Sequence, residues 1–167
     1  MDIALTHTTL SARRSAVSGM TLIEILIGLA VAGIVLAFAL PSFENSSRNS
    51  ALRAATMDLV TALNSARAQA VVQRANVTVT AVAGDWNQGW IVQYPAAAVE
   101  EDSEFTPPGG VQMLEVGGIN TVVFNQVGLP DAALDFNICD GRANETGRRV
   151  TVSRAGRVVT EDLSPCF

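Results

Sequence analysis

The stretch "SGMTLIEILIGLAVAGIVLAFALPSF", residues 18–43, decides the fold class of this chain. From Thr21 to Leu40 it contains one charged side chain, Glu24, in an otherwise almost wholly apolar run. Twenty residues of α-helix rise about 30 Å, which is the thickness of the hydrocarbon core of a bilayer. The run therefore predicts a membrane-spanning helix, in which a carboxylate is unfavourable unless it lies near the interface or has a partner.

The flanks of this run indicate how it is anchored. Arg13 and Arg14 precede it, and no small-residue cleavage site follows it. The run also exceeds the roughly 7–15 apolar residues of a secretory signal. Because basic residues favour the cytoplasmic side, residues after about 41 are predicted to lie on the other side of the membrane. We therefore expect a single-pass membrane anchor with an exported C-terminal domain.

Length, charge and cysteine content limit the class of protein further. The chain has 167 residues, enough for one modest domain beside a membrane segment. Its net charge of −5 disfavours a generic nucleic-acid binder. Because export leads to an oxidising compartment, we expect the two cysteines, Cys139 and Cys166, to form a disulfide.

A second periodic segment follows the apolar run, over residues 42–75. It has no glycine, and its apolar residues recur at steps of three and four, which is typical of an amphipathic helix. This apolar stripe consists of Leu52, Ala55, Leu59, Leu63, Ala66, Ala70 and Val71. Arg53, Arg67 and Arg74 fall mostly on the opposite face. The Asn and Ser side chains of residues 44–50 compete for backbone hydrogen bonds, so the helix is expected to loosen there.

Residues 76–167 change to the alternating pattern of short strands. Seven strands are expected, over residues 76–83, 89–94, 111–116, 120–124, 134–138, 148–154 and 156–161. Trp86 and Trp90 flank a turn and are predicted to pack at a hairpin. One long helix followed by short strands predicts an α+β fold, in which an antiparallel sheet wraps the C-terminal half of the helix.

The segment "PAAAVEEDSEFTPPGG", residues 95–110, is predicted to be an exposed loop. It has four acidic residues, all within 100–104, three prolines and no basic residue. An acidic loop of this kind is a candidate for calcium binding. It lacks the alternating acidic spacing of a dedicated calcium loop, so a solvated run of charge is the favoured interpretation.

The residues Gly19-Met20-Thr21-Leu22-Ile23-Glu24 resemble the processing site of type IV prepilins and type II secretion pseudopilins. The resemblance implies that a prepilin peptidase cuts between Gly19 and Met20, removes residues 1–19 as a leader, and leaves Met20 to be N-methylated. Residues 20–41 then form the membrane-spanning start of a long type IV pilin-like helix, and Pro41 falls where pilins carry a helix-kinking proline.

The same resemblance implies a role for Glu24 in assembly. In these filaments the family's glutamate is thought to meet the N-terminal ammonium of a neighbouring subunit, and paired buried charges offset each other's desolvation. The alternative is that Glu24 lies one turn inside the membrane and reaches the headgroups. The implied partners are other minor pilins or pseudopilins and the inner-membrane assembly platform.

Two further stretches narrow the resemblance. They are "LNSARAQAVVQRANVTV", residues 63–79, and "CDGRA…GRRVTVSRAGRVV…C", residues 139–166. They resemble the GspH/FimT family, which comprises H-type pseudopilins of type II secretion and the FimT and FimU minor pilins. The resemblance implies a structural subunit that initiates or caps a filament. The C-terminal cysteine pair favours a minor pilin over a secretion pseudopilin.

Catalysis is disfavoured because the processed chain would have neither lysine nor histidine. The chain has no lysine, and its one histidine, His7, lies in the implied leader. A mature chain without either residue has no histidine base or metal ligand and no lysine for a Schiff base or phosphate loop. We expect no catalytic residue, metal or cofactor.

DNA binding in natural transformation is the alternative function. Some FimT proteins bind DNA through a C-terminal G-R-x-R motif, whereas residues 156–159 here read G-R-V-V. The candidate DNA contacts are Arg148, Arg149, Arg154 and Arg157. If Ala155-Gly156 forms a two-residue turn, Arg154 and Arg157 face each other across the strands, which indicates either a nearby anion or side chains directed into water.

Overall fold

The computed structural model describes residues 19–95, 101–142 and 146–166, and the side chains of residues 38–42 lie outside the description. The chain divides between Pro41 and Ser42 into two compact units. The leader proposed for residues 1–19 lies almost wholly outside the described residues.

A single helix, α1 (Leu22–Gln73), runs through both units. It includes the polar residues 44–50, so the prediction that the helix loosens there is wrong. Local contacts explain the difference, because Arg48 pairs with Glu44 at 2.8 Å one turn away, and Ser50 Oγ donates to the Ser46 carbonyl at 2.9 Å. The side chains of this segment therefore bond along the helix and do not interrupt it.

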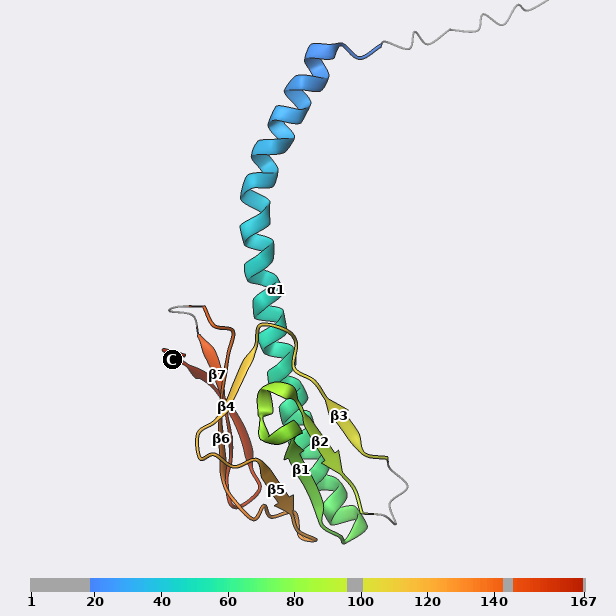
Figure 1. The fold of residues 1–167 in the computed structure, drawn as a ribbon, viewed down its shortest axis with the longest axis vertical. Helices are drawn as coiled ribbons and strands as arrows, with labels where there is room; N and C mark the ends of the chain where they lie inside the picture. The colour runs from blue at the N-terminus through green and yellow to red at the C-terminus, as the bar shows by residue number, and fades with distance from the viewer. Residues whose placement is uncertain (1–18, 96–100, 143–145, 167) are drawn as a thin grey trace, which may run out of the picture. The chain divides into compact units, whose positions relative to one another are not determined.

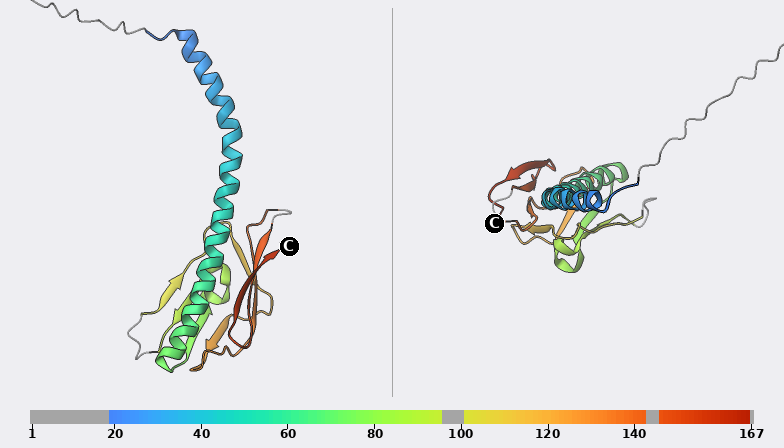
Figure 2. Two further views of the ribbon diagram at one scale, coloured as in Figure 1. Left: turned by 180° about the vertical axis from the view of Figure 1, so that it is seen from behind. Right: turned by 90° about the horizontal axis from the view of Figure 1, so that it is seen from above.

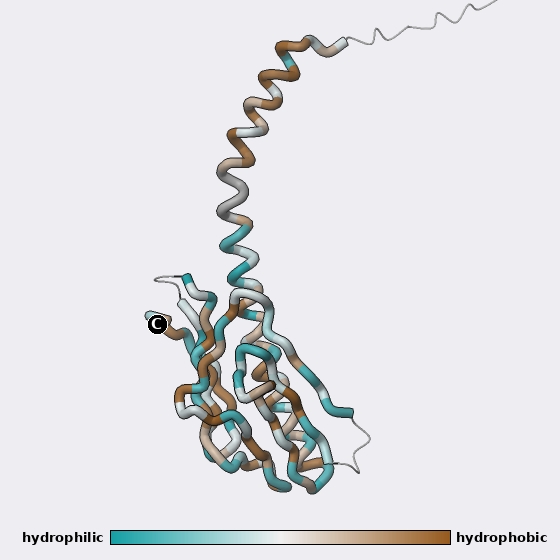
Figure 3. Tube along the Cα trace, viewed as in Figure 1, coloured by the Kyte–Doolittle hydropathy of each residue, from teal (hydrophilic) through white to brown (hydrophobic). Residues whose placement is uncertain are grey.

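In its described part, residues 19–41, the first unit consists of a short lead-in and the N-terminal part of α1. Its residues from 20 to 37 are exposed, and Figure 3 shows this part of the helix as mostly hydrophobic. Among the residues that the structure describes, no helix is long and apolar enough to cross a membrane. The predicted span includes residues 38–42, and the kink predicted at Pro41 also lies outside the described side chains.

The second unit packs two antiparallel four-stranded sheets against the rest of α1 (Figures 1 and 2). The first sheet has the order β3-β2-β1-β5 and comprises β1 (Val77–Ala81), β2 (Trp90–Gln93), β3 (Ser103–Phe105) and β5 (Thr121–Phe124). The second has the order β4-β6-β7-β8 and comprises β4 (Gln112–Glu115), β6 (Leu134–Cys139), β7 (Gly147–Val152) and β8 (Val158–Leu163). Two short 3₁₀ turns, Val82–Gly84 and Trp86–Gln88, connect β1 and β2.

Each of the seven predicted strands is present, but the prediction of one sheet is wrong. The chain makes two sheets because β5 returns to pair with β1 and β4 pairs with β6, so neighbours in sequence do not always pair. The eighth strand, β3, lies in the segment that was predicted to be an exposed loop. It pairs with β2, placing Phe105 opposite Trp90.

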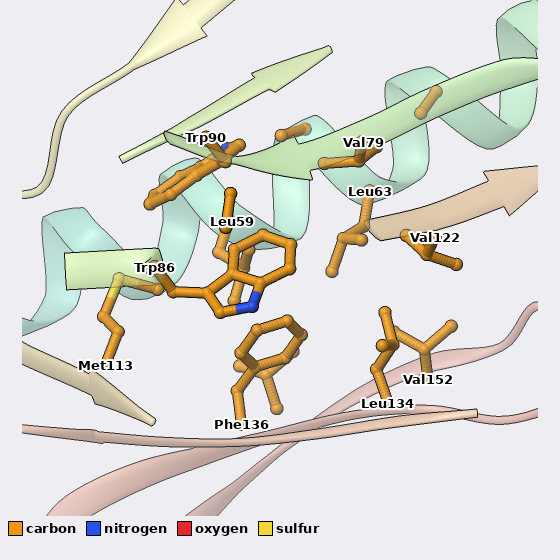
Figure 4. Packing of buried hydrophobic residues seen from close by; sticks show 14 of the residues in the cluster. Leu59, Leu63, Val79, Trp86, Trp90, Met113, Val122, Leu134, Phe136 and Val152 are labelled. Carbon is orange, nitrogen blue, oxygen red and sulfur yellow. The ribbon is translucent and has the colours of Figure 1, made fainter. Parts of the chain in front are cut away.

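The core lies between the second half of α1 and the two sheets (Figure 4). Its helix residues are Leu52, Ala55, Leu59, Ala62, Leu63, Ala66 and Ala70. The apolar stripe is therefore confirmed except at Val71, which is 47% exposed. Both tryptophans are buried, and Trp86 meets Phe136 of the second sheet edge to face at 4.8 Å between ring centroids.

The side chain of Arg67 does not lie on the solvent-exposed face of α1 as predicted. It is half-buried, and its Nε donates a hydrogen bond to the Gly128 carbonyl at 3.1 Å. A Cβ on Gly156, whose φ is +74°, would lie 2.5 Å from that same carbonyl oxygen and 2.9 Å from Arg67 Nε. The loop after β5 and the β7–β8 hairpin thus meet at one helix side chain.

Candidate functional sites

The N-terminal motif begins α1 with a side-chain cap. Thr21 Oγ1 accepts a hydrogen bond from the Glu24 backbone N–H at 3.3 Å, and the Thr21 carbonyl accepts one from Ile25 at 3.3 Å. Glu24 lies in the first turn, where the helix dipole favours a negative charge. The T-x-x-E spacing of a helix N-cap was present in the sequence and was missed as a structural role for Glu24.

Gly19 and Met20 lie just before this cap, in open surroundings. A Cβ on Gly19 would find nothing within 4 Å, and Met20 is 73% exposed. The Gly19–Met20 bond is therefore not covered by the described part of the chain. This geometry leaves the predicted cleavage position accessible, and cleavage itself stays a prediction.

The first half of α1 is apolar on every side and has no partner within its own unit. Its large exposed side chains include Leu22, Ile23, Ile25, Leu26, Ile27, Leu29, Val31, Ile34, Val35 and Leu36. A helix that is apolar all round is stable only when something else covers it. Most of the large exposed apolar side chains of the described residues lie in this segment, and it fits other apolar helices or lipid.

A polar anchor joins the start of the β6–β7 loop to α1. Arg142 Nε donates to Asp140 Oδ2 at 2.8 Å, and the other guanidinium nitrogens donate to Asn45 at 3.2 Å and Asn49 at 2.6 Å. The two asparagines are four residues apart and so lie on one face of the helix. The planar fork of arginine matches such a set of acceptors, whereas lysine does not.

Asp140 is buried beneath this anchor, with 7% of its surface exposed. The hydrogen bonds from the Arg142 side chain lower the pKa of Asp140 below its ordinary value of 3.8, although burial opposes the shift. The carboxylate is therefore charged in the folded chain, and the anchor is an ion pair. Nothing in the sequence pattern indicated it, because Arg142 lies 97 and 93 residues from its helix partners.

The disulfide between Cys139 and Cys166 is confirmed, with the two Cα atoms 6.0 Å apart. Cys139 is fully buried, and the bond ties the end of β6 to the C-terminal tail. Gly147, the first residue of β7, packs directly against it. A Cβ there would collide with Cys166 Sγ and would lie 2.6 Å from the Ile138 carbonyl oxygen, so no larger residue fits.

The candidate DNA-binding arginines do not form one cluster. Arg148 pairs with Asp162 across the β7–β8 ladder, and Arg149 lies 3.4 Å from Asp135 Oδ1. Arg154 and Arg157 are exposed at the hairpin, at the other end of β7. Because strands rise about 3.3 Å per residue, the two pairs are separated along the sheet, and acidic partners neutralise the first pair.

The prediction that Arg154 and Arg157 face each other is wrong. Ser153 N–H donates to the Arg157 carbonyl at 3.0 Å, and Gly156 N–H donates to the Ser153 carbonyl at 2.8 Å. The turn therefore has three residues, Arg154 to Gly156, with Gly156 at positive φ, and it sets Arg157 opposite Ser153. The inference of an anion between the two arginines has no geometric support.

The acidic loop also uses its charges locally. Asp102 Oδ1 accepts a hydrogen bond from the Tyr94 backbone N–H at 2.9 Å, which helps to hold β3 beside β2. In the described part of the chain, no three acidic, histidine or cysteine side chains are grouped to hold a metal ion. Glu100 lies outside the described residues, so the calcium alternative stays untested there.

Glu115 is a buried carboxylate that the sequence interpretation missed. It is 6% exposed, and its oxygens accept hydrogen bonds from the Ile119 backbone N–H at 2.6 Å and the Asp135 backbone N–H at 3.3 Å. It therefore fixes the β4–β5 turn against β6. The Gly-Gly pair that follows it, residues 117–118, was the available signal for a tight turn.

These features define a type IV pilin-like subunit: a long helix whose first half is apolar and uncovered, continued into a disulfide-stapled α+β domain. The chain belongs to the GspH family, described as type II transport protein GspH, whose sequence profile matches residues 55–156. The prokaryotic N-terminal methylation motif matches residues 14–40. Membership implies assembly with other pilins in a pilus or pseudopilus, and the methylation motif fits processing by a prepilin peptidase.

Two crystal structures of the type IV minor pilin FimU from Pseudomonas aeruginosa strain PAO1 are similar to this fold. The structure in space group P21 is 24% identical, with a TM-score of 0.59, over 70% of this chain and 95% of the FimU chain. The structure in space group P65 is 24% identical, with a TM-score of 0.57, over 69% and 99% of the two chains. No curated protein matches the sequence. The likeness confirms the type IV pilin fold.

Proposed function

We propose that the chain is a minor pilin or pseudopilin that initiates or caps a type IV pilus or a type II secretion pseudopilus. The observation that carries the proposal is the uncovered apolar half of α1, which lies within residues 14–40, the stretch that matches the methylation motif. In a filament, the corresponding helices of neighbouring subunits cover that half. Before extraction from the inner membrane, lipid covers it, with the globular unit in the periplasm. The subunit acts by packing, without a catalytic residue or cofactor.

Processing is the first step of this function. We expect cleavage between Gly19 and Met20, followed by methylation of the new amine. The intact mass of protein extracted from membranes tests both steps. Gly19→Ala should leave the precursor uncut, because the family's peptidase needs a very small residue at that position. A mature chain that begins after residue 40, or an uncut chain in the native host, would contradict the proposal.

Glu24 then guides assembly by meeting the ammonium of a neighbouring subunit. Glu24→Gln keeps the shape of the side chain and removes its charge, so the variant should enter the membrane and fail to join filaments. Glu24→Asp keeps the charge and should restore part of the incorporation. The measurement is the amount of each variant in sheared filament fractions relative to the membrane pool. Equal incorporation of all three chains would instead support a carboxylate that only reaches the headgroups.

The kind of filament is decided by the phenotype of a deletion strain. Loss of surface pili with normal protein secretion identifies a minor pilin, and the C-terminal disulfide favours this outcome. Loss of secreted enzymes with normal pili identifies an H-type pseudopilin. Restoring the phenotype with wild-type chain, but not with Glu24→Gln, links it to assembly rather than to expression.

A further inference from the structure

β8 forms one edge of the second sheet, and half of its backbone groups have no partner. It pairs with β7 alone. Because Ser153 N–H donates to the Arg157 carbonyl, the odd-numbered residues of β8 turn their backbone groups toward β7 and the even-numbered residues turn theirs away. The even-numbered residues are Val158, Thr160 and Asp162, and no hydrogen bond within the described chain engages them on the outer side.

The other sheet edges are closed or short. At β5, Asp131 N–H donates to the Val123 carbonyl at 3.0 Å, and Val123 N–H donates to Asp131 Oδ1 at 3.0 Å. At β4, Met113 N–H donates to Asn87 Oδ1 at 2.7 Å. β3 has three residues. Unprotected edges pair readily with other strands, and β8, with six residues, is the longest edge strand in the described part of the chain.

The exposed face of β8 carries an ordered pattern of side chains. Val150 and Val152 of β7 face the core, so their neighbours on β8 do too, and Arg157, Val159 and Glu161 share the opposite face. Arg157 and Glu161 are exposed and Val159 is half-buried. Arg149 of β7 lies opposite Glu161 in the register, but neither charge of β8 makes an ion pair among the described residues. This face therefore presents a base, an apolar residue and an acid in order.

We propose that the edge formed by residues 157–161, the β8 edge, binds an extended segment of another protein chain. The segment runs antiparallel to β8 and hydrogen-bonds to the outward groups of Val158 and Thr160. It places an acidic side chain opposite Arg157, an apolar one opposite Val159 and a basic one opposite Glu161. Read from its own N-terminus, the segment has the pattern base-x-apolar-x-acid. The choice of a different chain over a second copy rests on the proposed function, in which all copies point the same way.

The β8 strand of a second copy of the chain has the pattern base-x-apolar-x-acid, but pairing with it would set the two copies in opposite directions. Pairing β8 with its own copy requires a two-fold axis perpendicular to the sheet, which reverses every direction in the sheet plane. The second half of α1 runs alongside the sheets (Figure 1), so the two helices would point in opposite directions. Subunits whose second α1 halves point the same way, as the proposed filament role requires, cannot pair in this way, which assigns the edge to a different chain.

A peptide tests the proposal without the constraint of the helix. The probe is a fluorescent peptide of residues 156–164, GRVVTEDLS, which has the required pattern. Its matched control carries Arg157→Glu and Glu161→Arg, so that composition and net charge are unchanged. Fluorescence anisotropy against the full chain in detergent micelles should show the probe binding at least about tenfold more tightly, because the exchange turns two opposite-charge pairs into like-charge pairs.

The reciprocal variant shows that recognition lies in the pattern. The full chain carrying both Arg157→Glu and Glu161→Arg should prefer the control peptide by a similar factor, which a misfolded protein cannot do. N-methylation of the peptide at Val158 and Thr160 should abolish binding, since those amides face β8. N-methylation at Val159 and Glu161 should leave binding unchanged, since those amides face away.

Three results would overturn the proposal. Binding of neither peptide would mean that the charges of β8 only prevent edge pairing. Equal binding of both peptides would show that the charge pattern of β8 is not recognised. Binding that is the same whichever amides are methylated would show that the peptide does not hydrogen-bond to the β8 backbone. A full chain that is dimeric in detergent and is split by the probe would assign the edge to a second copy.

Discussion

The two halves of α1 differ in where their apolar side chains find partners. In the second half, Leu59 and Leu63 are fully buried against the two sheets, in a stripe with period close to 3.6. In the first half, Leu22 and Leu29 are 77% and 65% exposed, and apolar residues occupy every side. One half is therefore folded by its own chain, whereas in the proposed function lipid or other subunits cover the other half.

The largest expected effect comes from truncating a buried leucine in the second half of α1, and a leucine in the first half provides the comparison. Leu59→Ala should lower the free energy of unfolding by about 2–5 kcal/mol, because it opens a cavity in the core. Leu29→Ala should change it by less than about 0.5 kcal/mol, because the side chain has no partner within the chain. The readout is urea unfolding of the full chain in detergent, followed by the fluorescence of Trp86 and Trp90. Comparable losses in the two variants would contradict the division of the helix.

The sequence patterns predict the helix and the strands, but not how the strands pair. The apolar run and the 3.6-residue stripe predicted α1, and alternation predicted seven strands, because both signals are local. The split into two sheets depends on β1–β5 and β4–β6 pairing, which alternation does not encode. The sequence does not predict β3, because its three residues, Ser103–Phe105, show no apolar alternation.

The candidate sites divide in the same way. The Gly19–Glu24 motif and the cysteine pair were readable because each has a fixed spacing or a small number of partners. The Arg142 anchor was not, since its acceptors Asn45 and Asn49 are polar helix residues with no distinguishing pattern. The three-residue hairpin at Gly156 was misread as two residues because a glycine fits either turn.

Removing the disulfide should weaken the folded half alone. It closes a loop of 27 residues, and the chain-entropy model values such a loop at about 3–4 kcal/mol. Cys139→Ala with Cys166→Ala should therefore lower the free energy of unfolding by about that amount, without changing membrane extraction of the N-terminal half. Gly147→Ala should destabilise the same region, whereas Gly109→Ala should not, since a Cβ at Gly109 has open space. Equal effects of the two glycine substitutions would contradict the packing described at the disulfide.

Acid should weaken the folded half through Asp140. Its pKa is lowered in the folded chain, so its ion pair with Arg142 stabilises the fold above pH 3.8. That contribution is lost as the pH falls through the lower folded value. Asp140→Asn should therefore be less stable than wild type at neutral pH, and the gap should close in strong acid. Asp58, an exposed residue of α1, provides the control substitution Asp58→Asn. A gap independent of pH would show that the anchor is not ionic.

The smallest effect is expected at the hairpin arginines. Arg154→Ala with Arg157→Ala should change the free energy of unfolding by less than about 0.5 kcal/mol, because both side chains are exposed. Titration of labelled duplex DNA at two salt concentrations should show weak binding with a log–log slope no steeper than about −2, as expected for two phosphate contacts. Tight, salt-sensitive binding that the double substitution abolishes would instead make DNA capture the primary function.

Site-specific crosslinking tests the central claim most directly, that other subunits complete the first half of α1. One variant carries a photoreactive amino acid in place of Leu29. A second variant carries it in place of Met57, an exposed residue of the second half, and serves as the comparison. In sheared filaments, position 29 should crosslink to other pilin subunits in high yield, and in the membrane pool that yield should fall. Crosslinks from position 29 to lipid alone, with no subunit adduct in any filament fraction, would contradict the account.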